Sequence, residues 1–436
     1  MRLAGSALVA GLIQLTGCMS APSTWELAAS VERGIGGGFT LKTNASLFAV
    51  PPGIASLHGL SADDAVAIAL WNNAAFQEAL AGLGFNRADL LQAKQLRNPS
   101  LVALFPAGPK QFEFTALLPV ESLWLRPRRV AAANLDLEAA AGQLVASGLN
   151  LVRDVRVACA ELELAENRLE AAEASLRWRD ETVRISERRF QLGDISALEL
   201  AQARADASQA RQALGRLKRD EQLTRERLRT LLGLSTEGQP LTLECPPPDT
   251  GRLPPLPELL KQALAARPEL RANELVLEAA RKRGQLAMAE VVMVNAIVDG
   301  NQTASGAQIG PGLDATLPIF HQNQAARSRA ATQVQQAIFR HVTLRDRILL
   351  DVREAAARHA QSIAEMRSSR ELVMPALEAA VTHARNARDL GDAPPQVYID
   401  AERRLAETRV QEAEALAEFR RSEAELARAL GRRFRD

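Results

Sequence analysis

The chain has 436 residues, with 53 basic and 52 acidic side chains and a formal net charge of +1. A charge so close to zero provides no basic footprint for nucleic acid, so we expect no nucleic-acid partner. The five histidines and three cysteines show neither a metal-ligand spacing nor a paired nucleophile. The sequence therefore predicts no metal, no cofactor and no enzymatic activity.

The N-terminus has the pattern of an export signal. Arg2 is followed by an apolar segment, 3–13, that is too short for a permanent membrane span. Leu15-Thr16-Gly17-Cys18 comes next and resembles the bacterial lipobox, in which the chain is cut before the cysteine. We expect 1–17 to be a signal peptide and Cys18 to carry acyl chains such as palmitate, which anchor a chain to membranes. An ordinary signal peptide with an incidental cysteine is the alternative.

A first repeat is expected at 59–233, after an extended, glycine- and proline-rich linker at 18–58. It begins with one helix from Ser61 to Lys94, and a β-hairpin at about 100–120 follows. In the second arm of the hairpin, apolar and polar side chains alternate. This period is typical of a half-buried strand, and equally of a membrane strand between lipid and a wet lumen. The apolar positions are Phe112, Phe114, Ala116 and Leu118, and the polar ones are Gln111, Glu113 and Thr115.

A long helical hairpin at 123–233 completes this repeat. Its outgoing helix of about 66 residues would be roughly 100 Å long. Apolar residues spaced by three and four residues predict that the two helices pack as a coiled coil. Gly193 suits the left-handed position that ends a helix, and Asp194 or Ser196 can cap the next one. The apolar seam consists of Val152, Val155, Cys159, Leu162, Ala165, Leu169, Ala172 and Leu176, then Ala203, Ala207, Ala210, Leu214 and Leu217.

A second repeat is expected at 258–436, after a proline-rich connector at 234–257. It repeats the plan with a helix, a β-hairpin at about 291–319 and a long helical hairpin at 322–432. The hairpin turn is expected at 300–305. Gly193 and Gly391 are 198 residues apart, and so are Gly233 and Gly431. This constant offset predicts an internal duplication, and fold reasoning should start from it.

Several motifs in this order resemble the TolC-type outer-membrane efflux proteins. They are Ala-Leu-Trp-Asn-Asn at 69–73, Asn-Pro-Ser-Leu at 98–101, Leu-Pro-Ile-Phe at 317–320, and the two glycine-centred turns that precede alanine-rich return helices. The resemblance covers nearly the whole mature chain. It implies a mainly α fold with a small transmembrane β part, in which duplicated units of helix, β-hairpin and long helical hairpin form a trimer.

The resemblance also implies the function and partners. Each copy would give four strands to a shared 12-stranded β-barrel, which would continue into a periplasmic α-helical barrel. The homotrimer would be the outer-membrane channel of a tripartite efflux system, loaded by a periplasmic adaptor (membrane fusion) protein and an RND-type inner-membrane pump. The chain would lie in the bacterial outer membrane, lipid-anchored, with a long periplasmic extension. This agrees with the physics of strands, because two β-hairpins in one chain cannot close a barrel and open edges do not persist in lipid.

In the family, the glycine-centred turns form the periplasmic mouth. By resemblance, Leu192, Gly193 and Asp194 at one turn, and Leu390, Gly391 and Asp392 at the other, would contact the adaptor. Glu199 and Asp400 fall where the family can place acidic gate residues, and a ring of carboxylates would favour cations. The alternative is that both are solvated surface charges on mixed acidic and basic helices.

Two other functions remain open from the sequence. One is a lipid-anchored periplasmic coiled-coil scaffold without a pore, and the other is an outer-membrane conduit for protein secretion. The polar face opposite the apolar face in both β-hairpins favours a channel over a scaffold. Cys159 and Cys245 could pair in an exported chain, but Cys159 fits the apolar seam, which favours a free buried thiol.

Overall fold

The structure is a computed structural model that describes residues 24–39, 48–54, 57–105, 110–234, 241–244, 246–247, 251, 253–303 and 306–432. The chain divides into two compact units. The first takes its described residues from Met1–Gly34, Ala79–Val145 and Pro268–Arg345, and the second from Ile35–Glu78, Ala146–Arg267 and Asp346–Asp436. Both repeats therefore contribute to both units.

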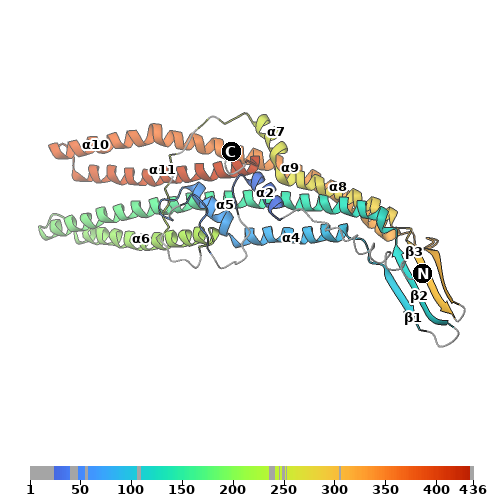
Figure 1. Ribbon diagram of the computed structural model, residues 1–436. Coiled ribbons are helices and arrows are strands. Elements are labelled where there is room, and N and C mark those ends of the chain that lie inside the picture. The colour runs from blue at the N-terminus through green and yellow to red at the C-terminus, as the bar shows by residue number, and fades with distance from the viewer. Residues whose placement is uncertain are drawn as a thin grey trace. The chain divides into compact units, whose positions relative to one another are not determined.

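One four-stranded antiparallel sheet lies in the first unit (Figure 1). Its strands follow the chain order: β1 (Ser100–Leu104), β2 (Lys110–Pro119), β3 (Val294–Thr303) and β4 (Gly306–Ala315). The β-hairpins of the two repeats join because β2 pairs with β3 along its length, from Pro119 opposite Asn295 to Lys110 opposite Thr303. The sheet remains open, with β1 and β4 as its edges.

The expected turn at 300–305 begins too early, because β3 continues to Thr303 and β4 starts at Gly306. Gly300 explains the difference. It lies opposite Phe114 on β2, and a Cβ on Gly300 would stand 2.2 Å from the Phe114 ring. A glycine in this strand therefore leaves room for an aromatic ring on the neighbouring strand, a role that differs from turn formation.

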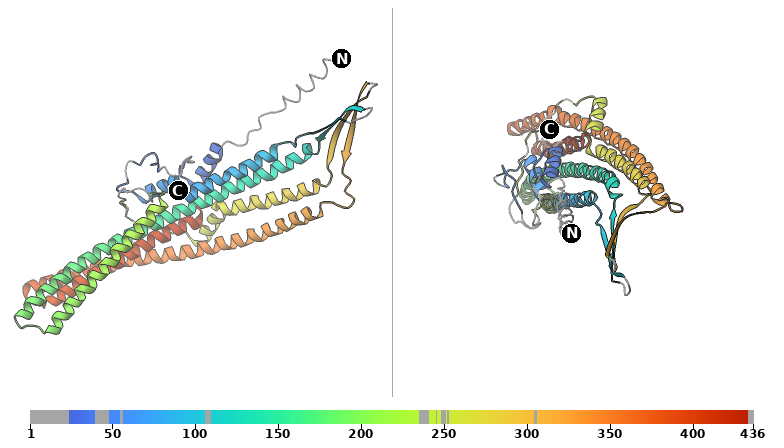
Figure 2. Two further views of the ribbon diagram at one scale, coloured as in Figure 1. Left: turned by 90° about the horizontal axis from the view of Figure 1, so that it is seen from below. Right: turned by 45° about the vertical axis from the view of Figure 1, so that its right-hand side comes forward.

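Four helices adjoin this sheet within the first unit (Figure 2). They are α4 (Ala74–Lys94), the beginning of α5 (Ser122–Gln191), α8 (Pro268–Ala289) and the beginning of α9 (Gln324–Ser368). Helices α5 and α8 approach closely at Gly142, where a Cβ would stand 3.0 Å from the Cβ of Ala272. An ion pair between Arg283 and Asp136 joins the same two helices.

The single helix expected from Ser61 to Lys94 is two helices, α3 (Ala62–Asn72) and α4, with a break at Asn73. Asn73 leaves the helical region at ψ 118°, and its side-chain oxygen accepts a hydrogen bond of 3.0 Å from the amide of Phe76, capping α4. The second repeat breaks likewise between α7 (Leu256–Ala266) and α8. There Arg267 has ψ 115°, as the following Pro268 requires.

The expectation of extended linker at 18–58 is also wrong in part. Helix α2 (Thr24–Ile35) lies within it, and its last residue, Ile35, is fully buried. Ile35 packs where α5 carries Gly148, at which a Cβ would be 2.4 Å from the Ile35 side chain. Export-signal residues 1–17 and Cys18 lie outside the described residues.

The long helices of the two repeats differ in continuity. Helix α5 runs without a break for 70 residues, roughly 105 Å. The second long helix, expected from 322 to 388, consists of α9, a π-turn η1 (Ser369–Val373) and α10 (Met374–Leu390). Pro375 in the first turn of α10 has no N–H to donate, and the Met374 amide bonds to the Ser369 carbonyl, which gives the wider π geometry.

Return helices α6 (Ala197–Leu231) and α11 (Pro395–Leu430) run back along α5 and α10 respectively (Figure 1). Within the described chain, no helix combines the length and the hydropathy that crossing a membrane requires.

Candidate functional site

The α5–α6 and α10–α11 turns have the same backbone geometry. Gly193 has φ 83° and Gly391 has φ 78°, so the predicted left-handed conformation is confirmed at both. The amide of Asp194 bonds to the carbonyl of Arg189 at 2.9 Å, and the amide of Asp392 bonds to the carbonyl of Ala387 at 2.8 Å. These bonds satisfy carbonyls at the end of each outgoing helix.

Each turn presents one large apolar side chain to solvent. Leu192 is 77% exposed and Leu390 is 76% exposed. Asp194 and Asp392, each two residues further on, are exposed as well. An exposed leucine beside a carboxylate could contact a helical partner through both apolar and polar groups. The adaptor contact stays a prediction, and the geometry of the turns suits it. It was predicted for Leu192, Gly193, Asp194, Leu390, Gly391 and Asp392.

The two candidate gate residues occupy different surroundings. Glu199 forms a capping box with Ser196 at the start of α6: the Ser196 amide donates to the Glu199 carboxylate at 3.1 Å, and the Glu199 amide donates to the Ser196 hydroxyl at 3.2 Å. Asp400 lies 3.7 Å from the Arg403 guanidinium, and its side chain is exposed. Glu199 therefore has a structural task, and the gating role of both residues stays a prediction.

Four regularly spaced ion pairs connect α5 to α6. They were not predicted from the sequence. The acidic residues stand seven positions apart on α5 and the basic residues seven apart on α6, so the pairs recur at every second turn of the antiparallel coil. This spacing is visible in the sequence and could have predicted the register. The pairs are Glu187–Arg204 at 2.8 Å, Asp180–Arg211 at 2.5 Å, Glu173–Lys218 at 3.1 Å and Glu166–Arg225 at 2.8 Å.

An aromatic cluster near the second turn was also missed. Tyr398 is buried on α11, and the Trp178 ring from α5 meets it edge to face at 6.3 Å. The Arg388 guanidinium lies 4.3 Å from the centre of the Tyr398 ring, within the range of a cation–π interaction. Arg388 also pairs with Asp389, the next residue in the chain, at 2.7 Å.

A groove of about 750 Å³ lies between α5, α6 and α11 in the second unit. Small and apolar residues such as Ala172, Leu217 and Val410 line it together with charged ones, among them Asp400 and Arg403. The groove contains Trp178 from the aromatic cluster. Asp400, one of the two candidate gate residues, therefore lies on the surface that the two helical hairpins share.

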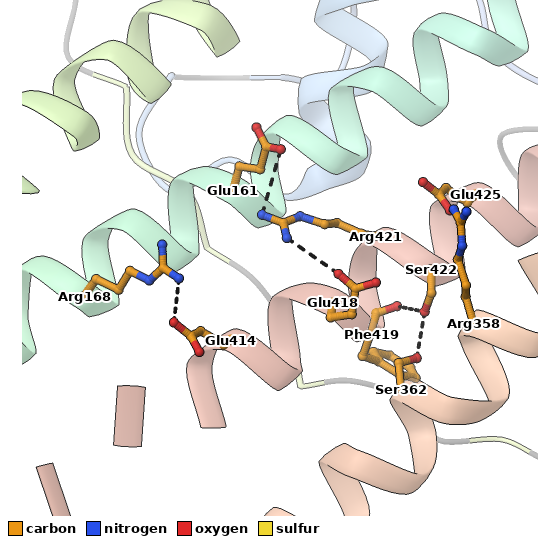
Figure 3. Close-up of polar contacts among 10 residues, drawn as sticks. All are labelled: Glu161, Arg168, Arg358, Ser362, Glu414, Glu418, Phe419, Arg421, Ser422 and Glu425. Carbon is orange, nitrogen blue, oxygen red and sulfur yellow. Dashed lines mark hydrogen bonds and ion pairs between the residues drawn. The ribbon is translucent and has the colours of Figure 1, made fainter. Parts of the chain in front are cut away.

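Helix α11 is fixed to α5 and α9 by polar contacts (Figure 3). Glu414 pairs with Arg168 of α5 at 2.5 Å, and Arg421 lies 3.8 Å from Glu161 of the same helix. Two further contacts reach α9: the hydroxyls of Ser362 and Ser422 are 2.7 Å apart, and Arg358 pairs with Glu425 at 3.2 Å.

His359 joins this buried polar cluster. Its Nδ1 is 3.0 Å from the Ser422 hydroxyl, and its ring lies 5.2 Å from the Phe419 ring. The imidazole is 8% exposed. Burial, helped by the positive charge of Arg432, lowers the pKa of His359 from its ordinary value of 6.5.

The remaining candidates from the sequence are the cysteines and possible metal ligands. Cys159 is buried on the α5 seam, as expected, whereas Cys18 and Cys245 lie outside the described residues. Among the residues that the structure describes, no group of three or more histidine, cysteine or acidic side chains could hold a metal ion.

Comparison with known proteins supports the resemblance stated from the sequence. Residues 67–234 match the family model described as outer membrane efflux protein. The cobalt-zinc-cadmium resistance protein CzcC of Cupriavidus metallidurans is 24% identical over 385 residues, which cover 86% of this chain and 90% of CzcC.

Solved structures share the fold. A crystal structure of CusC superposes with a TM-score of 0.71 and 18% identity, over 91% of this chain and 99% of CusC. The outer membrane protein VceC of Vibrio cholerae gives 0.67 and 19%, over 86% of this chain and 96% of VceC. The open state of the MtrE outer membrane channel of Neisseria gonorrhoeae gives 0.66 and 18%, over 88% of this chain and 95% of MtrE.

These matches confirm the fold class, and the family model over residues 67–234 supports the resemblance to the TolC-type outer-membrane efflux proteins. The relatives are bacterial outer-membrane channels. Residues 67–234 form an outer membrane efflux protein domain, in a chain with the fold of the outer-membrane efflux channels.

Proposed function

We propose that three copies of this chain close one 12-stranded barrel in the outer membrane, and that their helices form the periplasmic tube of a tripartite efflux system. One observation carries this proposal: the sheet is open at β1 and β4, one of its faces is apolar, and the polar side chains gather on the other face among apolar ones. An open edge is costly in lipid, and pairing of β4 with β1 of the next copy removes both edges.

The register assigns every strand residue to a face, because directly paired residues share one. Ala103, Phe114, Gly300 and Ile309 are paired in sequence across the four strands and lie on the apolar face. Glu113, Asn301 and Gln308 are paired on the other face. The apolar face suits lipid, and the polar face suits a wet lumen.

Charge on the polar face favours cationic cargo. Glu113, Asp299 and Asp314 belong to it by register, and Asp299 accepts a hydrogen bond of 2.8 Å from Thr115. From Phe112 to Pro119, and throughout β1, β3 and β4, the sequence has no lysine or arginine. CzcC is named for resistance to cobalt, zinc and cadmium. We therefore propose efflux of cations, and assign protein secretion and a pore-free scaffold to the alternatives.

The anchor and partners complete the proposal. Cleavage after residue 17 would leave Cys18 acylated, and the exposed turns at Gly193 and Gly391 would receive a periplasmic adaptor that connects the tube to an RND-type pump. Radiolabelled palmitate should enter the wild-type chain and should not enter the Cys18→Ser variant.

Cysteine cross-linking between strand edges tests the trimer. In a background without Cys159 and Cys245, Leu101→Cys on β1 is combined in turn with Ile309→Cys and Leu313→Cys on β4. Within one chain these positions lie on opposite edges of the sheet, so a disulfide between them is expected only between copies. For the pair in register we expect covalent dimers and trimers and no larger species. Leu101→Cys alone is the matched control and should give no trimer. Monomers for every combination would contradict barrel closure.

A further inference from the structure

The four connections between strands and helices in the first unit converge on one pocket of about 480 Å³. The α4–β1 connection, the first turn of α5, the α8–β3 connection and the β4–α9 connection each contribute to it. The lining residues that matter here are Arg97, Leu125, Glu290, Met293, Leu317 and Phe320. The pocket therefore lies where the sheet ends and the helices begin.

Two apolar residues of the lining are largely uncovered. Phe320 is 92% exposed and Leu317 is 75% exposed. Leu317 follows Ile309 and Leu313, the large exposed apolar residues on the apolar face of β4, at the same spacing of four residues. The apolar surface of the sheet thus extends to the pocket, where hydrocarbon would cover it favourably.

Charged side chains also belong to this pocket: Arg97 and Glu290 line it, and Glu121 lies beside Arg97. Glu121 is 2% exposed, and its carboxylate lies 3.6 Å from the Arg97 guanidinium, too far for a hydrogen bond. The Arg97 side chain is half exposed, so its donors can serve a second anion while Glu121 holds it in place. Glu290, partly buried, lines the same pocket.

We propose that this pocket binds a phospholipid with a zwitterionic, primary-amine headgroup. The phosphate accepts hydrogen bonds from Arg97, the ammonium group donates to Glu290, and an acyl chain covers Leu317 and Phe320. A choline headgroup has no N–H to donate to Glu290, and an anionic headgroup leaves Glu290 without a cation. The inference rests on the proposed membrane position of the sheet, and Glu121 acts as a positioning residue.

Lipid retention by the full-length trimer tests this. The protein is exchanged into phosphatidylcholine nanodiscs containing phosphatidylethanolamine or phosphatidylglycerol, and bound lipid is counted by native mass spectrometry. We expect preferential retention of phosphatidylethanolamine, reduced about tenfold in Glu290→Gln and in Arg97→Gln, since each loses one charge-assisted hydrogen bond. Glu278→Gln and Arg347→Gln, exposed residues on α8 and α9 outside the pocket, are the matched controls and should retain it.

Because Arg97→Gln leaves the buried Glu121 without its ion-pair partner, the double variant Arg97→Gln/Glu121→Gln is measured beside it. Equal retention of both lipids, unchanged retention in the pocket variants, or full competition by inorganic phosphate would overturn the proposal. Conductance is recorded on the same samples. A conducting trimer without the lipid preference refutes the lipid site alone, whereas the absence of a trimer refutes the proposed function.

Discussion

The two helical hairpins follow one backbone plan and stabilise it by different chemistry. In α5–α6 the outgoing helix is unbroken, and four ion pairs recur every seven residues. In the second hairpin a π-turn at Ser369–Val373 precedes α10, and an aromatic cluster around Tyr398 lies near the turn.

One ion pair is common to both hairpins and has exchanged its charges. Glu187 pairs with Arg204 in the first, and at the positions 198 residues later Arg385 lies 3.6 Å from Glu402. The duplication thus kept an ion pair at equivalent positions while the sign of each partner changed. Backbone geometry is the conserved element, and side-chain chemistry is the variable one.

The ends of the return helices α6 and α11 also keep one geometry with different side chains. Asn73 donates from its side-chain amide to the Leu231 carbonyl at 3.0 Å, and Arg267 donates from Nε to the Ala429 carbonyl at 2.7 Å. Leu231 and Ala429 each stand two residues before a left-handed glycine, Gly233 and Gly431. Two unlike side chains therefore make the same contact at the same place in each repeat.

The largest expected effect comes from these glycines. A Cβ on Gly233 would stand 2.6 Å from the Asn72 carbonyl oxygen, whereas on Gly431 the nearest atom, the Ala266 carbonyl carbon, is 3.1 Å away. We expect Gly233→Ala to lower the free energy of unfolding by about 1–3 kcal/mol more than Gly431→Ala. Thermal midpoints of the two variant trimers measure the difference. Equal midpoints would show that the repeats tolerate the change alike.

A smaller effect is expected at the turns. No atom lies within 4 Å of a Cβ built on Gly193 or Gly391, so only the left-handed backbone opposes a side chain there. Replacing either with Val should cost about 1–2 kcal/mol locally and impair adaptor docking more than trimer assembly. Efflux assays and trimer mass measure the two properties. Unchanged efflux in both variants would contradict adaptor contact at the turns.

The buried His359 predicts a pH dependence specific to the second repeat. Its pKa is lowered in the folded state, so the unfolded chain binds the proton more readily. The stability that neutral His359 contributes is complete above about pH 6.5 and is lost as the pH falls below it towards the folded pKa. Unfolding by urea at pH 8 and at pH 5.5 measures this loss. His359→Gln should flatten the profile relative to the exposed-site control His383→Gln, and an identical profile would contradict it.

The smallest effect belongs to the exposed ion pairs. Arg211→Glu should weaken α5–α6 packing by at most about 1 kcal/mol, because the Asp180–Arg211 pair is solvent-exposed. The exchange Asp180→Arg with Arg211→Asp should restore it, as the natural pair Arg385–Glu402 suggests. Hydrogen exchange of α6 amides measures both variants. If the charge-swapped double variant does not regain protection of its α6 amides, the register does not tolerate charge reversal.

Much of this fold could be predicted because its signals are periodic or repeated. Alternation over 112–118 identified β2, and the recurrence of Leu-Gly-Asp identified both turns. Local breaks could not be found in this way. The Asn73 break has no following proline, and the role of Gly300 depends on Phe114, a residue far away in the sequence. Glu199 was placed by resemblance, and its capping contact with Ser196 emerged only in the structure.

The central claim is that three copies of this chain make one conducting tube. The most direct test is single-channel conductance of the purified protein in planar bilayers, combined with its mass in detergent. We predict a trimer with steady, cation-selective openings, and weaker selectivity when Glu113, Asp299 and Asp314 are replaced by their amides. A monomer in every detergent without conductance would contradict the channel and favour a lipid-anchored scaffold.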